Sequence, residues 1–322
     1  AGFSSTYYNQ GSLNNKGVEF SLNAQIIDSS SWKWSVSGNI GVNRNEISDL
    51  GLLPADFGCL GERVGYYGNS LGDHFGVGHI FLAGEAPGLF YGYVTQGIVQ
   101  KEDITENGIK YIKQDGSVGY YQTVNKTTPV AGDVKYVDRN GDGVVDDNDR
   151  DIIGNPNPDF TYGFQTKVSW KSLSLSASFN GVQGRDILNV GNRYNNTPGT
   201  KSNNVTRKAF QNMWTDENPS NLYPKSTFVV QNMVMDRYVE DGSYLRCSDI
   251  TLSYVLPAKW TNKIGIKNTS VYASVKNAFV ITDYSGYDPE VNSFAFDGLR
   301  PGVDMNSYPT PRSFVFGLNL TF

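Results

Sequence analysis

The sequence contains no long apolar run. None of its hydrophobic stretches approaches the ~20 residues that a membrane-spanning helix requires, so a helical membrane protein is excluded. Cysteine and histidine are scarce, with two residues of each. The separation of Cys59 and Cys247 permits a disulfide without predicting one, and no cysteine spacing typical of a metal site occurs. We interpret both cysteines as structural or free.

Basic residues are also few. The 27 Lys and Arg residues are outnumbered by 32 Asp and Glu residues, which gives a formal net charge of −5. A nucleic-acid partner would require a basic face, so the composition argues against one. The sequence has no nucleophile elbow, P-loop or dinucleotide-binding fingerprint. We therefore predict that the protein is not an enzyme.

Aromatic residues are abundant, with 20 Tyr and 17 Phe, and many of them recur with a period of two. In the stretch RSFVFGLNLTF, every second residue from Phe314 to Phe322 is apolar, and the intervening residues are mostly small or polar. Such alternation is typical of strands with one apolar and one polar face. We predict seven strands of roughly membrane-spanning length, at 16–27, 31–43, 159–170, 172–182, 244–256, 269–281 and 312–322.

A secreted β-sandwich also has alternating strands, but those strands are commonly ~5–6 residues long. The segments predicted here are longer, and the small and polar residues between their apolar positions suit a wall that faces water. We therefore predict an all-β fold, a transmembrane antiparallel β-barrel with long extracellular loops.

Tracing the strands backwards from Phe322, placed at the periplasmic rim, assigns a side to each connection. The short connections 28–31, 171–172 and 257–268 become periplasmic, and the long ones at 44–158, 183–243 and 282–310 become external, as in bacterial outer-membrane barrels. Aromatic residues then fall at the heights where membrane barrels carry interfacial girdles. The predicted girdle comprises Trp32, Trp34, Trp170 and Phe322 near the lower interface and Tyr162 near the upper one.

Seven strands cannot close a bacterial barrel, because single-chain barrels have an even number of strands and at least eight. Plugged transporters reach ~22 strands. We therefore interpret residues 1–322 as the C-terminal part of a larger, plugged barrel.

Six motifs occur in a fixed order: NNKGVEFSLNAQ, LFYGYVTQGIVQ, GDVKYVDRNGDGVVDDNDRDIIGNPNPDFTYGF, VEDGSYLRCSDITLSYVLP, VKNAFVITDYSGYDPEV and SYPTPRSFVFGLNLTF. In this order they resemble the C-terminal part of the SusC/RagA family of TonB-dependent outer-membrane transporters of Bacteroidota. The resemblance implies a 22-stranded barrel with an N-terminal plug, energised by the TonB complex and capped by a SusD-like surface lipoprotein. Such pairs import oligosaccharides or peptides. The plug and the TonB-contacting segment have no counterpart in this sequence.

Two other functions stay open from the residues alone. A passive porin or structural outer-membrane barrel would lack the plug. A secreted, β-rich carbohydrate-binding protein would be released without detergent. The residues do not distinguish a glycan from a peptide cargo, and we assign no residue to substrate.

One acidic stretch, DRNGDGVVDDND, has the spacing of a twelve-residue calcium loop. It offers oxygen ligands at positions 1, 3, 5, 7, 9 and 12 and has Gly143 at position 6, where the chain must turn sharply. Position 12 is Asp instead of the usual Glu. The alternative to a calcium site is a solvated acidic turn, since Asn-Gly and Asp-Gly form turns without a metal. We predict a structural Ca²⁺ bound by Asp138, Asn140, Asp142, the Val144 carbonyl, Asp146 and Asp149.

A short amphipathic helix is predicted within 206–224. Ala209, Phe210, Met213 and Trp214 would share one of its faces.

Overall fold

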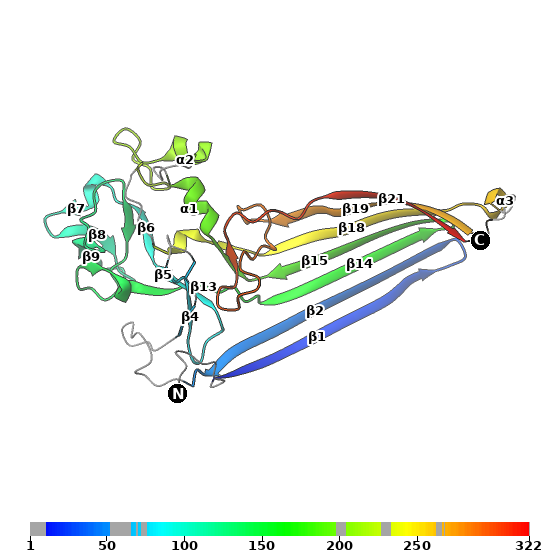
Figure 1. Cartoon of the computed structure of the whole chain (residues 1–322), viewed down its shortest axis with the longest axis horizontal. Helices are drawn as coiled ribbons and strands as arrows, with labels where there is room; N and C mark the ends of the chain where they lie inside the picture. The colour runs from blue at the N-terminus through cyan, green and yellow to red at the C-terminus, as the bar shows by residue number, and fades with distance from the viewer. Residues whose placement is uncertain are drawn as a thin grey trace, which may run out of the picture.

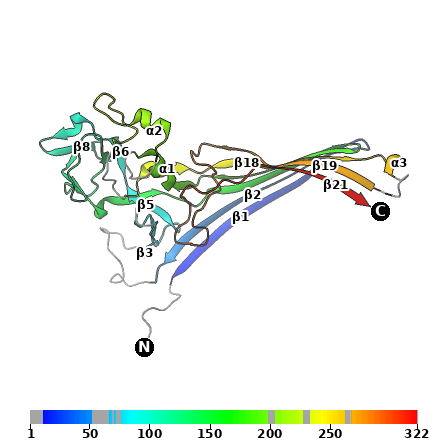
Figure 2. The same cartoon turned by 45° about the horizontal axis from the view of Figure 1, so that its top comes forward.

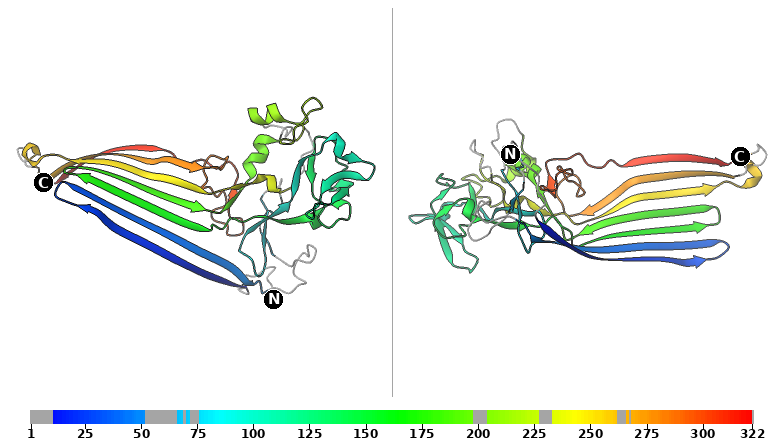
Figure 3. Two further views of the ribbon diagram at one scale, coloured as in Figure 1. Left: turned by 180° about the vertical axis from the view of Figure 1, so that it is seen from behind. Right: turned by 60° about the horizontal axis from the view of Figure 1, so that its bottom comes forward.

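Seven long antiparallel strands form one sheet along the long axis of the molecule, and the long connections between them gather at one end (Figure 1). The computed structural model describes residues 11–51, 66–68, 70–71, 76–197, 204–226, 233–261, 266 and 268–321. Figure 3 shows the strands side by side, in the order β1-β2-β14-β15-β18-β19-β21. They are β1 (Ser12–Asp28), β2 (Trp32–Asp49), β14 (Phe160–Trp170), β15 (Leu173–Gln183), β18 (Tyr244–Val255), β19 (Asn268–Thr282) and β21 (Ser313–Thr321).

The predicted all-β fold is confirmed, and each long strand overlaps one predicted segment. The largest difference is at β2, which continues to Asp49 instead of ending at residue 43. The added residues include charged and amide side chains, so the period-two apolar signal fades there. Backbone pairing nevertheless continues, with Lys16 opposite Arg44 and Leu13 opposite Ile47. Among the described residues, β1 and β21 are the two edges of the sheet.

Three long connections fold into a layer of small sheets, which we call the loop layer (the described residues of 50–159, 184–243 and 283–312). Figure 2 shows it at one end of the curved main sheet. Its first part contains β3 (Tyr66–Tyr67), β4 (His79–Phe81), β5 (Leu89–Tyr93), β6 (Thr95–Ile98), β7 (Ile104–Thr105), β8 (Gly108–Ile112), β9 (Val118–Tyr121), β10 (Thr123–Val124), β11 (Val134–Tyr136), β12 (Val144–Val145) and β13 (Arg150–Gly154), with short 3-10 helices η2 (Lys101–Asp103) and η3 (Asp147–Asp149).

The rest of the loop layer holds the longer helices. Its elements are β16 (Asp186–Asn189), α1 (Val190–Asn196), α2 (Arg207–Asn212), the 3-10 helix η4 (Asp236–Tyr238), β17 (Val239–Asp241) and β20 (Val303–Asp304). The helix predicted within 206–224 is therefore much shorter than expected. Thr206 caps its start through a hydrogen bond from the Ala209 N–H, and Met213 is already extended. Met213 instead pairs with Tyr223, so Met213 and Trp214 lie outside the helix.

The hydrophobic core lies in the loop layer and not against the main sheet. Tyr111, Tyr121, Tyr136 and Phe90 are at most 1% exposed. Buried tyrosines need a partner for the hydroxyl, and the Tyr111 hydroxyl donates to the Asp138 carbonyl at 2.6 Å. At the opposite end of the sheet, the described residues form short connections and α3 (Ala258–Thr261) (Figure 1).

Candidate functional site

The register of the main sheet places the apolar stripes of all seven strands on one face. Residues directly opposite each other in an antiparallel pair point to the same side of the sheet. One row of such pairs crosses the whole sheet and consists of apolar residues: Ile27, Trp34, Val168, Leu175, Leu252, Ala273 and Phe316. We call this side the apolar face.

Strand β1 differs from the prediction in one detail. A register shift between Gln25 and Ile27 makes Ile27, and not Ile26, the partner of Trp34. A bulge inserts one residue and so breaks the strict period of two that placed Ile26 in the stripe.

The apolar face is not covered by any other part of the described structure. Phe20 is 61% exposed and Phe316 is 79% exposed. Phe164, Phe179 and Phe279 form a row across β14, β15 and β19, with ring centroids 6.2 and 6.3 Å apart. Cys247 of β18 is the cross-strand partner of both Phe179 and Phe279. Its side chain is fully buried, and its thiol is free. Cys59 lies outside the described residues. A water-soluble surface rarely has an apolar area of this extent.

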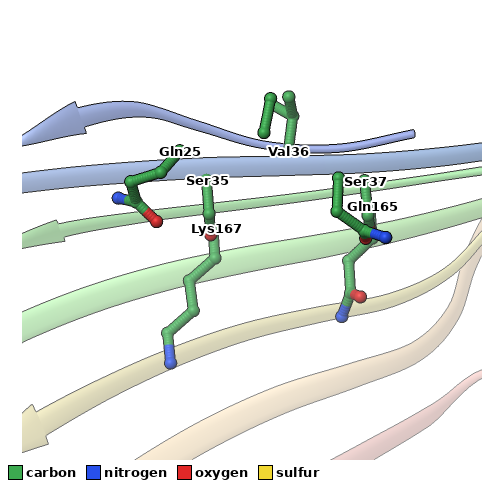
Figure 4. A pocket seen from close by; sticks show the side chains of 8 residues that line it. Gln25, Ser35, Val36, Ser37, Gln165 and Lys167 are labelled. Atoms are coloured by element: carbon green, nitrogen blue, oxygen red, sulfur yellow. The ribbon is translucent and has the colours of Figure 1, made fainter.

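The opposite side, the polar face, consists mainly of small, amide and charged side chains. Figure 4 shows Gln25, Ser35, Ser37, Gln165 and Lys167 on one side of the strands and Val36 on the other. Hydrogen bonds link neighbouring strands here: the Ser169 and Ser174 hydroxyls are 2.8 Å apart, and the Lys276 ammonium is 2.6 Å from Asp249.

Three of the predicted girdle residues meet at the end of the sheet that lies away from the loop layer. Trp32 and Trp170 are direct cross-strand partners, and the Trp34 indole N–H donates to the Thr166 hydroxyl at 3.0 Å. Tyr162 is on the same strand and face as Trp170 but eight residues away, about 26 Å at the usual rise of a strand. Phe322 lies outside the described residues. The girdle role of these side chains stays a prediction.

The acidic loop at 138–149 is ordered by hydrogen bonds between its own groups. The buried Asp138 carboxylate accepts from the Gly141 and Gly143 N–H groups at 2.6 and 2.8 Å. The buried Asp149 carboxylate accepts from the Arg139 and Asp146 N–H groups at 2.7 and 2.8 Å. Burial raises the pKa of Asp149 even though these backbone donors oppose the shift.

The other predicted calcium ligands are more open to solvent. Asp142 accepts from the Val144 N–H and from the Asn140 amide, and Asp146 caps η3 through Asn148. Within the described residues, no group of three or more His, Cys, Asp or Glu side chains is placed to hold a metal ion. Carboxylate and amide oxygens are ligands that suit Ca²⁺, but in this structure the carboxylates accept hydrogen bonds from backbone N–H groups of the loop. Calcium binding by this loop stays a prediction.

No helix among the described residues is long and apolar enough to cross a membrane. No protein-family model matches the chain.

Comparison with individual proteins gives a consistent result. The chain is 31% identical over 330 residues to TonB-dependent receptor P26 of Formosa agariphila, a match that covers all of this chain and 30% of that protein. It is 32% identical over 323 residues to TonB-dependent receptor SusC of Bacteroides thetaiotaomicron, covering 98% of this chain and 27% of that protein. The chain thus spans less than a third of the length of these relatives.

A solved structure described as the RagAB peptide transporter also matches. Its TM-score is 0.68 at 26% identity, and the match covers all of this chain and 31% of that one. Each of these proteins is named as a receptor or transporter and not as an enzyme, in agreement with the prediction that this chain is not an enzyme.

Proposed function

The chain is SusC/RagA-like along its whole length, and from this premise we propose that it forms part of the wall and loops of a TonB-dependent transporter. The transporter would import oligosaccharides or peptides across the bacterial outer membrane. In this proposal the sheet crosses the membrane, the loop layer faces the exterior and the substrate passes along the polar face.

The observation that best supports this proposal is that the main sheet has one apolar and one polar face. In hydrocarbon, a strand must satisfy its backbone groups by pairing with neighbours and must present apolar side chains to lipid. The five inner strands do both, since each pairs on two sides and one continuous face is apolar, while β1 and β21 each pair on one side within the described residues. A polar opposite face is what a water-filled or plugged lumen requires.

The loop layer supports a role in substrate handling. Its folded core and its many hydrogen bonds hold long connections in a defined arrangement at one end of the wall. We propose that a SusD-like surface lipoprotein covers this layer. Coupling to the TonB complex would involve other parts of the receptor, which correspond to the regions of the relatives that this chain does not match.

The proposal is tested in cells that carry the complete receptor or a deletion of its gene. Uptake of labelled oligosaccharides and of labelled peptides is measured with and without a functional TonB. We expect uptake of one cargo class to require both the receptor and TonB. Uptake that continues without TonB would indicate a passive porin instead.

Fractionation tests the location independently. We expect the receptor in the detergent-extracted outer-membrane fraction, together with a surface lipoprotein that copurifies with it. Recovery in buffer without detergent would favour the secreted carbohydrate-binding protein. Purification of the receptor without any lipoprotein would contradict the proposed SusD-like partner only.

A further inference from the structure

The loop layer contains a polar cavity of about 480 Å³ between α1, α2, η4 and the segment that follows β19. Figure 1 shows α1 and α2 next to each other at the loop end of the sheet. Five asparagines line the cavity (Asn189, Asn192, Asn195, Asn196 and Asn306), and its lining has no Ala, Val, Leu, Ile or Met side chain. We call it the asparagine cavity.

Its wall is held in place by the Glu240 carboxylate. One oxygen of Glu240 accepts from the Asn189 and Asn192 amides and from the Ser285 hydroxyl, each at 2.9 Å. The other oxygen accepts from the Ser285 N–H at 2.9 Å. Glu240 therefore joins the start of α1 to β17 and to the chain after β19. It keeps its negative charge, but the two cations of the lining, Lys208 and Arg237, outnumber it.

Four of the asparagine side chains use only half of their carboxamide within the described structure. Asn192 and Asn195 donate through their amide nitrogens, to Glu240 and Asn306 respectively. Asn196 and Asn306 accept through their oxygens. No other bond of these four carboxamides joins them to a described residue, which leaves both acceptors and donors for a ligand.

Arg237 adds a positive charge that no carboxylate neutralises within the described residues. One of its terminal nitrogens donates to the Leu222 carbonyl, while the other, Nη1, is buried without a hydrogen-bond partner. Because Nη1 is buried, an occupant of the cavity would interact with the charge of the Arg237 guanidinium in the cavity wall and not with this atom directly. Lys208 also lines the cavity and forms no ion pair with a described residue.

We propose that the asparagine cavity binds an acidic sugar unit of an oligosaccharide, with its carboxylate or sulfate group at Arg237 and Lys208. This inference rests on the proposed transport function and names the substrate class. Hydroxyl groups both donate and accept hydrogen bonds, and so they match carboxamides that offer both. The ring of Tyr287, which is 70% exposed, provides a flat surface for a sugar ring. The lining offers no pocket of aliphatic residues for the apolar side chains of a peptide, which favours the sugar.

Binding to the complete receptor, purified in detergent with its natural partners, tests the inference. The probes are trigalacturonate, a sulfated galactose trisaccharide, neutral galactotriose and an acidic tripeptide, each titrated by calorimetry. We expect an anionic trisaccharide to bind at least about tenfold more tightly than galactotriose, the gain typical of a charge-assisted contact. The carboxylated and sulfated probes distinguish the two anionic groups.

Variants locate the contact. Arg237→Gln and Lys208→Gln should each weaken binding of the anionic trisaccharide and leave the neutral one unchanged. Lys208 is exposed, so its substitution keeps the test valid if the Arg237 variant fails to fold. Lys110→Gln removes an exposed lysine of the loop layer outside the cavity and should have no effect.

Three results would overturn the inference: equal affinity for neutral and anionic sugars, tightest binding of the peptide, or no binding of any probe. TonB-dependent uptake of another cargo in the same cells would then show that the proposed transport function stands without it. If the cells with the complete receptor showed no TonB-dependent uptake of any cargo, the transport proposal itself would be contradicted.

Discussion

Arg246 of β18 and Asp288 of the chain after β19 form a buried ion pair, with Nη2 of the arginine 2.5 Å from Oδ1 of the aspartate. Glu290 lies on the same guanidinium at 2.8 Å. Asp288 also accepts from the Glu290 and Thr310 N–H groups at 2.9 and 3.0 Å. This cluster fastens the segment 283–312 of the loop layer to the main sheet.

Replacing one member of this pair should release the segment. Asp288→Asn leaves the Arg246 charge buried and without its closest partner, a change that typically costs about 3–5 kcal/mol. We expect faster hydrogen exchange of backbone amides in 283–312, measured by mass spectrometry. Asp216→Asn is the control, because Asp216 pairs with Lys101 in solvent and such pairs contribute little. Equal exchange in both variants would contradict the role of the pair.

The same cluster predicts a pH dependence of the segment. Burial by itself would raise the pKa of Asp288, but the backbone donors and Arg246 outweigh burial and lower it. The pKa of an aspartate carboxyl in the unfolded chain is about 3.9. A carboxyl whose pKa is lower in the folded protein stabilises the fold at pH values above about 3.9, and this stabilisation is lost as the pH falls through the pKa of the folded state. We therefore expect the protection of amides in 283–312, taken relative to their intrinsic exchange rate at each pH, to be constant from neutral pH to about pH 4 and to fall below it, with a smaller fall in Asp288→Asn.

Trp32 and Trp170 should stabilise the end of the main sheet that lies away from the loop layer. Their ring centroids are 6.0 Å apart, and such aromatic pairs contribute about 0.5–1.5 kcal/mol beyond the area they bury. We expect Trp170→Ala to lower the denaturant midpoint of the receptor in lipid vesicles. Tyr308→Ala, which removes a 90% exposed ring in the loop layer, serves as the control. An unchanged midpoint for Trp170→Ala would argue against an interfacial girdle at this end.

Gly317 of β21 gives space to the ring of Tyr272 on the polar face. A Cβ at Gly317 would lie 2.2 Å from that ring, whereas a Cβ at Gly38 has no atom closer than 3.6 Å. We expect Gly317→Ala to destabilise the main sheet by about 1–3 kcal/mol, as overpacking does, and Gly38→Ala to have little effect. Adding Tyr272→Ala should remove most of the penalty of Gly317→Ala in a double-mutant cycle. Simple additivity of the two changes would show that the ring is not the obstacle.

The calcium prediction is tested at an exposed ligand position. Asp142→Ala removes one proposed ligand and its hydrogen bonds within the loop. We expect calcium to increase the protease resistance of residues 138–149 in the parent receptor but not in this variant. Asp115→Ala removes an exposed aspartate elsewhere in the loop layer and should behave as the parent does. The same resistance of parent and Asp142→Ala in calcium would refute a bound ion at this position.

Sequence alone determined the main sheet. The side chains of a strand alternate between two sides, so the positions of Phe20, Leu175, Leu252 and Phe316 were sufficient to define one apolar face. The prediction failed where this local signal ended. Residues 44–49 continue β2 through backbone pairing, which needs no apolar side chain. The predicted helix after Thr206 ends before Met213 because pairing with Tyr223 extends the chain there.

Tertiary structure alone decided what the loop layer contains. Asn192, Arg237, Ser285 and Asn306 come from segments far apart in sequence, and no periodicity relates them. They meet because strand order brings the ends of β15, β18 and β19 together and because Glu240 hydrogen-bonds across two of the connections. A repeating pattern can be recognised from neighbours along the chain, whereas a site built from long-range contacts exists only once the chain has folded.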